Sequence, residues 1–334
     1  MRGNNVGIIF YSKKNQIKLK DFSKKEIPAF AKYYPDVDLI KAQALKYRKY
    51  KNIIIAARGG SITSFYAYFG ALNNVSSGKK VYFVDTADPD FLYNVKKSCT
   101  KKDTLLIVIS KSGKTIDVIE NYLYFSSFDS VFITTPDYNP LYKIAQKRNI
   151  EVLSHPEIGG RYSGLTATAL LPAYLVGIDI AKLADGAKKA YSDFSPKKKN
   201  NNALKVATWL YENDKKGFVD IYNPIYSSGL KYFSELIMQL IHESVGKKGK
   251  GPSIIPVSAP ESQHHSNQRY FGGRKNIQGL FIYQNDFLRN EKIMVPNDIS
   301  KISLRDHDLS VINKLELKKA MAAEFAGSFE DSVK

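Results

Sequence analysis

The sequence has one cysteine and no long apolar run in its 334 residues. A single cysteine, Cys99, excludes an internal disulfide framework and a zinc site built from several cysteines, and it fits a reducing compartment. The longest apolar stretch, residues 169–180, is interrupted by a proline and a glycine and is too short to cross a bilayer. A short apolar patch at residues 6–11 is followed at once by Lys13 and Lys14, without the cleavage site of a signal peptide. We therefore expect a soluble, cytoplasmic protein with no membrane contact.

Acidic residues are also scarce relative to basic ones. Lys and Arg number 50 and Asp and Glu 32, which gives a formal net charge of +18. Most lysines are scattered doublets, and the denser clusters are residues 197–199 and 247–250. No basic motif is interleaved with aromatic residues, so the pattern does not favour nucleic acid as the partner. A solvated lysine-rich surface accounts for most of the charge, and an anionic substrate is compatible with the rest.

The hydrophobic pattern predicts an α/β fold. Hydrophobic residues make up 43% and aromatic residues 12% of the chain, which excludes disorder. Runs rich in β-branched residues alternate with helical stretches, as in folds with mainly parallel sheets. The predicted strands are residues 52–57, 80–85, 104–110, 130–135, 150–153, 218–222, 253–257 and 279–283. The predicted helices include residues 63–72, 115–125, 164–176, 227–244 and 315–325.

The length allows about two domains. A polar segment, residues 192–202, holds a proline, three lysines and three asparagines and is the best candidate for a linker. The α/β pattern restarts after it. We therefore expect a first domain over residues 1–190, with an N-terminal arm, and a second over residues 191–334.

A hydroxyl-rich loop follows the predicted strand at residues 104–110. It contains Ser110, Ser112 and Thr115, and it leads into a helix whose first N–H groups point outward. Aligned N–H groups, hydroxyls and the helix dipole together bind phosphate. An ordinary loop capped by Ser and Thr is the alternative.

A glycine turn, Gly59-Gly60-Ser61, occupies the matching place after the strand at residues 52–57. Parallel strands present their carboxyl ends at one edge of the sheet, where open α/β sheets bind ligands. We therefore expect this turn to converge with the hydroxyl-rich loop.

A second pair of glycines precedes Arg161, in the run Gly159-Gly160-Arg161-Tyr162-Ser163. Paired glycines allow the backbone to approach a ligand closely. An adjacent arginine is suited to stabilise a developing oxyanion. A surface loop with a salt-bridged arginine is the alternative.

The predicted helix at residues 227–244 carries Glu243 at the edge of its apolar arc. Gln239 lies one turn earlier on the same side. A carboxylate at such a boundary loses solvation, which suits a general base that works near neutral pH. The alternative is a solvated glutamate at a helix end.

Two adjacent histidines, His264 and His265, lie in a polar loop after the predicted strand at residues 253–257. A histidine there can exchange a proton with a sugar hydroxyl or ring oxygen. Adjacent histidines point in different directions and no metal-ligand spacing accompanies them, so we expect no metal site.

In this order the segments resemble the glucose-6-phosphate isomerase family, which has two sugar-isomerase (SIS) domains. The run at residues 159–163 resembles the family's GGRYS signature, and residues 239–247 (QLIHESVGK) its glutamate-bearing segment. Residues 263–266 (QHHS) resemble the family's histidine loop, and residues 110–115 the SIS phosphate loop. The resemblance covers residues 50–330 and implies two three-layer α/β/α subdomains with mainly parallel sheets.

The resemblance implies isomerisation of glucose 6-phosphate to fructose 6-phosphate through an enediol. Glu243 would be the base, Arg161 would stabilise the enediolate, and His265 would assist ring opening from the neighbouring subunit of a homodimer. Gln239 would orient the base or the substrate. The substrate's phosphate would be held by the glycine turn and the hydroxyl-rich loop, that is, by Gly59, Gly60, Ser61, Ser110, Ser112 and Thr115. Neither a metal nor a cofactor is implied.

The sequence departs from the family at two places. The family's first glycine turn reads G-I-G-G-S, whereas this chain has Arg58 before the two glycines; the arginine either contacts the phosphate or turns outward. The family closes with a Q-P-G-V-E-x-x-K type segment whose lysine joins in ring opening, and this chain has none. Either the chain is a fragment, or Lys318, Lys319 or Lys334 substitutes, or a separate polypeptide supplies the segment.

Two other functions are compatible with the sequence. One is a bifunctional glucose and mannose 6-phosphate isomerase, since short SIS enzymes of this kind have a similar length. The other is a SIS protein that binds a phosphosugar without efficient catalysis, which the absence of the closing lysine favours and the presence of Glu243, Arg161 and His265 disfavours.

Overall fold

The structure is a computed structural model that describes residues 29–72, 78–193 and 201–333. The apolar patch at residues 6–11, most of the predicted linker (residues 194–200) and Lys334 lie outside the described residues. Within the described ranges, no helix has both the length and the apolar character needed to cross a bilayer.

The described chain forms two compact units. The first unit comprises residues 29–204 and 232–244, and the second comprises residues 205–231 and 245–333. Helix α10 (Phe233–Val245) therefore belongs to the first unit up to residue 244, although its neighbours in sequence belong to the second. The division at residues 190 and 191 stays a prediction.

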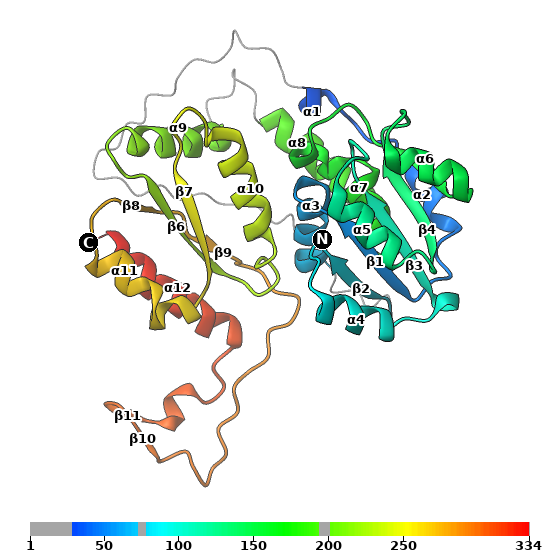
Figure 1. Cartoon of the computed structure of the whole chain (residues 1–334). Coiled ribbons are helices and arrows are strands. Elements are labelled where there is room, and N and C mark those ends of the chain that lie inside the picture. The colour runs from blue at the N-terminus through cyan, green and yellow to red at the C-terminus, as the bar shows by residue number, and fades with distance from the viewer. Residues whose placement is uncertain (1–28, 73–77, 194–200, 334) are drawn as a thin grey trace. The chain divides into compact units, whose positions relative to one another are not determined.

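A parallel five-stranded sheet forms the centre of the first unit, in the order β2-β1-β3-β4-β5 (Figure 1). The strands are β1 (Asn52–Ala57), β2 (Lys80–Val84), β3 (Thr104–Ile109), β4 (Asp129–Thr134) and β5 (Glu151–Ser154). The middle strands β1 and β3 are continuous apolar runs because both faces of a parallel sheet are covered. Ala57 pairs with Ile109, so the carboxyl ends of β1 and β3 lie side by side.

Helices cover both faces of this sheet and make three layers. Side chains alternate along each strand, so Ile53 and Ile55 face one core and Ile54 and Ala56 face the other. On the side of Ile53 lie α2 (Val37–Leu45), α3 (Gly60–Leu72), η2 (Gly160–Leu165), α7 (Ala167–Leu175) and α8 (Ile180–Asp193). On the other side lie α4 (Pro89–Lys97), α5 (Ile116–Tyr124) and α6 (Pro140–Arg148). The short elements α1 (Ala29–Lys32) and η1 (Lys101–Asp103) complete the first unit.

The connections from β1 and β3 run in opposite directions across the sheet. The chain passes from β1 through α3 to β2 on one side, and from β3 through α5 to β4 on the other. A crevice opens at such a switch point, beyond the carboxyl ends of the two strands. The glycine turn and the hydroxyl-rich loop both start at this place.

The second unit has a smaller parallel sheet, in which β6 pairs with β7, β8 and β9. Aromatic contacts join the sheet to its helices: Tyr226 on β6 meets Phe325 on α12, and Tyr222 stacks on Tyr270 of α11. The elements are α9 (Asn202–Asp214), β6 (Asp220–Tyr226), β7 (Ser253–Ser258), η3 (Glu261–His264), α11 (Ser266–Gly272), β8 (Ile277–Gly279), β9 (Ile282–Tyr283) and α12 (Leu317–Val333).

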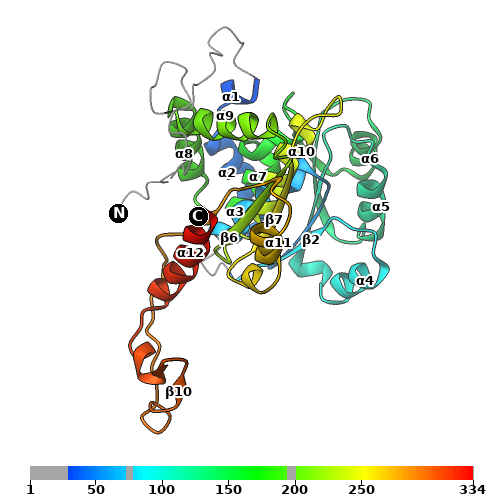
Figure 2. The same cartoon turned by 90° about the vertical axis from the view of Figure 1, so that its left-hand side faces the viewer.

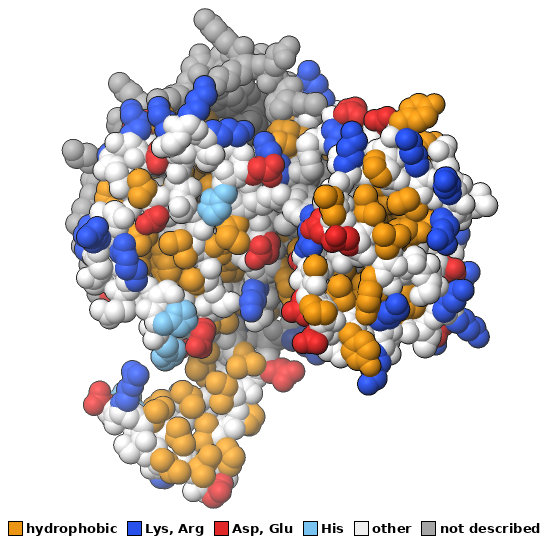
Figure 3. All heavy atoms as spheres, in the orientation of Figure 1, with side chains coloured by type: hydrophobic (Ala, Val, Ile, Leu, Met, Phe, Trp, Pro, Cys, Tyr) orange, Lys and Arg blue, Asp and Glu red, His pale blue; other side chains and the backbone are white. Residues whose placement is uncertain are grey.

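An extension of the second unit lies between β9 and α12. It carries β10 (Ser303–Leu304), β11 (His307–Asp308) and η4 (Leu309–Ile312), and in both cartoon views it projects away from β6–β9 (Figures 1 and 2). Apolar side chains gather on its surface (Figure 3), and Leu288 is 79% exposed. An isolated two-stranded ribbon is only marginally stable in water.

The predicted elements agree with the structure in the first unit and differ in part in the second. The five strands of the first unit and the α/β fold are confirmed. The helix predicted to begin at residue 227 begins at Phe233, because β6 continues to Tyr226 and a turn follows it, in which the Leu230 N–H donates to Ser227 Oγ. The strand predicted at residues 279–283 is wrong as one strand, since β8 and β9 pair separately with β6.

Candidate active site

A cavity of about 460 Å³ lies at the carboxyl ends of β1 and β3. Ser61 of the glycine turn and three predicted phosphate ligands of the loop, Ser110, Ser112 and Thr115, line it. Its other lining residues are Arg58, Ile109, Lys111, Lys114, Val118, Thr135, Asp137 and Glu157. The structure therefore brings the turn and the loop to one cavity, as the topology leads us to expect.

The hydroxyls of the loop hold its backbone in shape. Ser110 Oγ lies 3.0 Å from Thr115 Oγ1 and accepts a hydrogen bond from the Gly113 N–H at 3.1 Å. Ser112 Oγ accepts from the Lys114 N–H at 3.3 Å. The Thr115 side chain makes no capping hydrogen bond to α5. The first turn of this helix therefore has no cap from Thr115, although the Val118 N–H donates to Asp117 Oδ1 at 3.1 Å.

Gly113 is required by the packing of this loop. Its φ is +60°, and an added Cβ would lie 1.8 Å from Asn139 Oδ1. Asn139 caps α6 by accepting from the Tyr142 N–H, and it donates to Thr135 O. Any side chain at residue 113 would displace this cap, so only glycine fits both the dihedral angle and the space.

Charged pairs surround the cavity. Arg58 donates through Nε to the carboxylate of Asp117, in the first turn of α5. Lys111 pairs with Glu157 at 3.0 Å. The sequence left open whether Arg58 contacts the phosphate or turns outward. In the structure Arg58 lines the cavity and its side chain is paired with Asp117. The positive charge beside the loop is partly neutralised.

The glycine turn also touches the segment that carries Arg161. A Cβ on Gly60 would lie 2.2 Å from the backbone N of Arg161, so the two backbones approach as closely as glycine permits. Gly59 has a φ of +49°, and a Cβ there would lie 3.0 Å from Gln239 Nε2. One turn therefore contacts the cavity, η2 and α10.

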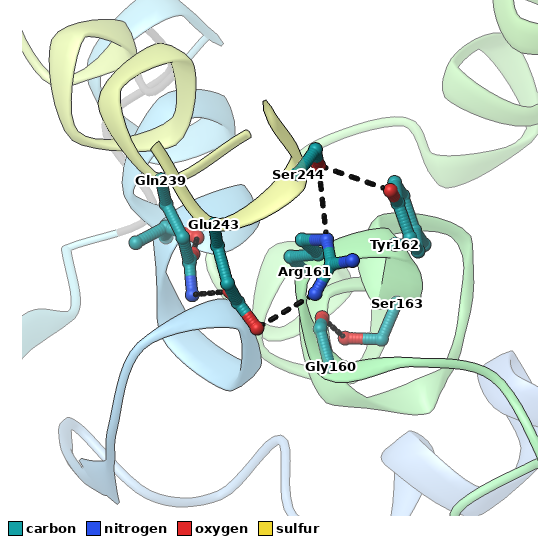
Figure 4. Close-up of polar contacts among 8 residues, drawn as sticks. Gly160, Arg161, Tyr162, Ser163, Gln239, Glu243 and Ser244 are labelled. Carbon is teal, nitrogen blue, oxygen red and sulfur yellow. Dashed lines mark hydrogen bonds and ion pairs between the residues drawn. The ribbon is translucent and has the colours of Figure 1, made fainter. Parts of the chain in front are cut away.

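Arg161, Gln239 and Glu243 form a cluster beside this turn (Figure 4). Arg161 Nη1 donates to Glu243 Oε1 at 2.7 Å, across 82 positions of sequence. Gln239 Nε2 donates to the other carboxylate oxygen, Oε2, at 3.2 Å. Both oxygens of Glu243 thus have donors, which holds the orientation of the carboxylate.

Ser244 and Tyr162 hold the arginine in place (Figure 4). Arg161 Nε donates to Ser244 Oγ at 3.1 Å, and the Tyr162 hydroxyl lies 3.1 Å from the same oxygen. The guanidinium also lies 4.7 Å from the centre of the Tyr162 ring. Hydrogen bonds to Tyr162 and Glu243 raise the pKa of Arg161, so the cation is permanent.

Glu243 is less buried than the apolar arc of its helix suggests. Its side chain is 51% exposed and that of Arg161 is 20% exposed. The ion pair, rather than desolvation, is the main feature of its environment. Glu243 does not line the cavity, but an exposed carboxylate of this kind is accessible to a substrate.

His265 lies in the second unit, directly before α11. Its Nδ1 lies 2.6 Å from Ser266 Oγ, and the side chain is exposed. The preceding Gln263 donates to Glu324 O and Ser328 Oγ of α12, which anchors the histidine loop to its own unit. Lys318 pairs with Asp286 at 3.2 Å, and Lys319 lies 3.9 Å from Glu316.

Among the residues that the structure describes, no group of three or more His, Cys, Asp and Glu side chains is placed to hold a metal ion.

Several contacts of the cluster are not apparent from the sequence. Thr63 Oγ1 on α3 donates to Gln239 Oε1 at 2.8 Å, and nothing in the sequence around Thr63 indicates this. The sequence also gives no indication that Asp117 is the partner of Arg58. Ser244 could be identified from the sequence, because it directly follows Glu243 within the glutamate-bearing motif.

The sequence comparisons decide the family. The chain is 30% identical over 277 residues to the glucose-6-phosphate isomerase of Methanocaldococcus jannaschii, an alignment that covers 78% of this chain and 67% of that protein. The chain belongs to the glucose-6-phosphate isomerase family. It spans between 56% and 67% of the length of the first three curated relatives that it matches. No family model matches it.

Solved structures agree on the fold of this glucose-6-phosphate isomerase family member. A hypothetical protein from Thermus thermophilus superposes with a TM-score of 0.81 at 21% identity, covering 93% of this chain and 78% of that one. A glucose-6-phosphate isomerase from Chlamydia trachomatis superposes with a TM-score of 0.67 at 20% identity, covering 89% of this chain and 58% of that one. At these identities the likeness establishes the fold alone.

Proposed function

We propose that this chain interconverts glucose 6-phosphate and fructose 6-phosphate. One observation carries the proposal: Glu243 and Arg161 meet at 2.7 Å beside a glycine turn whose Ser61 lines a cavity rich in hydroxyl donors. A base, a cation and an anion site in contact with one turn are the groups that an enediol isomerisation needs. Membership of the glucose-6-phosphate isomerase family supports the choice of sugar.

In the proposed reaction Glu243 moves one proton within the open-chain sugar. Its carboxylate removes the proton from C2 of glucose 6-phosphate, and the electron pair of that bond forms the C1=C2 double bond while negative charge develops on O1. Arg161 stabilises this enediolate oxygen. Glu243 then returns the proton to C1, the proton of the C2 hydroxyl passes to O1, and the C2 hydroxyl becomes the carbonyl, so the ketose results without an external oxidant. Gln239 keeps the base oriented.

The phosphate is assigned to the cavity. Ser61, Ser110, Ser112 and Thr115 supply hydroxyls, and the turn at Gly59 and Gly60 lets the backbone come close. Arg58 adds positive charge in this proposal, held toward the cavity wall by Asp117. Phosphate binding through a helix N-terminus, hydroxyls and a nearby arginine follows general rules of anion recognition.

We also propose a cytoplasmic homodimer, with His265 of one subunit assisting ring opening in the site of the other. Family resemblance is the basis for this arrangement. The exposed apolar side chains of the extension add support, because contiguous apolar surface marks interaction sites. They are Leu288, Met294, Ile299, Ile302, Leu304 and Val311.

Turnover of fructose 6-phosphate by the purified chain tests the proposed reaction. We expect formation of glucose 6-phosphate, and a loss of about 1000-fold in kcat for Glu243→Gln because the base is gone. The affinity for fructose 6-phosphate, measured by calorimetry, should be retained. Glu235→Gln, an exposed glutamate on the same helix, is the matched control and should behave as the wild type.

Two other results would change the assignment. Binding of fructose 6-phosphate without turnover in the wild type would make the chain a phosphosugar-binding protein. Turnover of mannose 6-phosphate at a comparable rate would make it the bifunctional isomerase.

A further inference from the structure

A hydroxyl from α3 reaches the side chain that holds the base. Thr63 is buried, with 7% of its surface exposed, and its Oγ1 donates to Gln239 Oε1 at 2.8 Å. The two residues are 176 positions apart in sequence. Thr63 does not line the phosphate cavity. Its polar contact is therefore directed at α10 and not at the anion site.

This hydrogen bond holds the Gln239 amide with its nitrogen toward Glu243. A glutamine amide has an acceptor oxygen at one end and a donor nitrogen at the other. A hydroxyl donor at the oxygen leaves Nε2 toward Glu243 Oε2, where it donates at 3.2 Å. The reversed amide would place its oxygen against a carboxylate oxygen, and two acceptors in contact repel.

The glycine turn also packs against the Gln239 amide. A Cβ on Gly59 would lie 3.0 Å from Gln239 Nε2, so the amide nitrogen lies directly against the turn. Glu243 also receives Nη1 of Arg161 on its other oxygen. Among the contacts described for Glu243, Arg161 is the charged group and Gln239 the neutral one. The orientation of the carboxylate therefore depends on both.

We propose that Thr63 is a positioning residue for the isomerisation, acting through Gln239 to orient the Glu243 carboxylate. This inference rests on the proposed function, since it assigns Thr63 a part in the same proton transfer. Thr63 touches neither the phosphate cavity nor the carboxylate, so its removal affects the chemical step and leaves phosphosugar binding intact.

A double-mutant cycle between Thr63 and Gln239 tests the inference in the full chain. Thr63→Val keeps the shape of the side chain and removes the hydroxyl, and Gln239→Leu removes the amide. We expect Thr63→Val to lower kcat for fructose 6-phosphate about tenfold with KM unchanged. In the Gln239→Leu background the same substitution should change kcat by less than about twofold, because the group through which it acts is gone.

Two controls separate positioning from packing. Thr63→Ser keeps the hydroxyl and should retain wild-type kcat. Ser64→Ala removes the neighbouring buried hydroxyl of α3, which lies against Gly164, and should also retain it. Thermal unfolding checks that each variant is folded, and Thr63→Ala enters the same cycle should Thr63→Val not fold.

The outcomes are distinct. An equal loss of kcat from Thr63→Val in the wild-type and Gln239→Leu backgrounds would show that Thr63 acts by packing and would overturn the inference, as would wild-type kcat in Thr63→Val. No turnover in the wild type would overturn the proposed function and, with it, the inference. Turnover in the wild type supports the proposed function. If Thr63→Val also lowers kcat only in the chain that keeps Gln239, and not in Gln239→Leu, the result supports the inference as well.

Discussion

The hydroxyl-rich loop and the base cluster are assembled in different ways. The loop, residues 110–115, makes its defining hydrogen bonds between residues that are at most five positions apart. The cluster of Arg161, Gln239 and Glu243 depends on contacts that span 82 and 176 positions. The side-chain hydrogen bonds of the loop are thus local in sequence, although Gly113 also packs against Asn139. The cluster exists only when α3, η2 and α10 are packed together. We therefore expect substitutions in the loop to change mainly KM, and substitutions in the cluster to change mainly kcat.

Among the substitutions that test this comparison, the largest effect is expected at Gly60, which lies against Arg161 and next to Ser61 of the cavity. In Gly60→Ala the new Cβ meets the Arg161 backbone at 2.2 Å, and backbone cannot move aside as a flexible side chain does. We expect kcat to fall about 100-fold and the free energy of unfolding to fall by about 3 kcal/mol. Kinetics with fructose 6-phosphate and chemical denaturation measure the two effects.

Gly159→Ala is the matched control for Gly60→Ala. A Cβ there meets Tyr162 Cδ2 at 3.4 Å, which is an ordinary contact, so the variant should stay close to the wild type. Equal damage from both substitutions would show that the close approach at Gly60 is not what the cluster depends on.

The second effect concerns the loop. Ser110→Ala removes the acceptor of the Gly113 N–H and the neighbour of Thr115 Oγ1. We expect KM for fructose 6-phosphate to rise about tenfold with little change in kcat, because phosphate binding contributes to ground state and transition state alike. Ser126→Ala, at the other end of α5, serves as the control. A fall in kcat at constant KM would contradict the proposed separation of the two regions.

A smaller effect is expected from the pair of Arg58 and Asp117. Arg58→Ile removes positive charge beside the cavity, so KM should rise about threefold. Asp117→Asn releases the arginine from its acidic partner, so KM should fall about threefold. Both changes should shrink at high ionic strength because salt screens exposed charges. If both variants raise KM alike, the pair acts as a structural unit rather than as a source of charge.

The smallest effect concerns stability alone. Burial lowers the pKa of His155, which follows β5 and precedes the segment of Arg161. The unfolded chain takes up a proton on this ring below about pH 6.5, and the folded chain does so only at lower pH, so acidification favours unfolding. Acidification from about pH 7 to about pH 5 should lower the free energy of unfolding of both proteins. We expect this decrease to be about 1 kcal/mol smaller in His155→Asn than in the wild type.

Exposed His264 offers the control for this prediction, since His264→Asn should leave the pH dependence of stability unchanged. An unchanged pH dependence in His155→Asn would show that burial of this ring is not linked to folding. Denaturant unfolding at several pH values measures both variants.

Much of the first unit could be predicted from the sequence. Its strands are apolar runs such as residues 52–57 and 104–109, which are buried on both faces and bounded by turn residues. The hydroxyl-rich loop and the glycine turn could be placed at one sheet edge because parallel strands end together. The start of α10 was predicted six residues early, since propensity does not reveal that β6 continues to Tyr226.

The sequence by itself determined the α/β pattern, the six-residue loop and the residue types of the base cluster, because each depends on neighbours along the chain. Only the tertiary structure decided that α10 packs in the first unit, that Arg161 pairs with Glu243, and that Arg58 pairs with Asp117. The reason is physical. An amide or a guanidinium can bond to many partners, and the choice among them is made by which helices pack together and by where glycine lets two backbones approach.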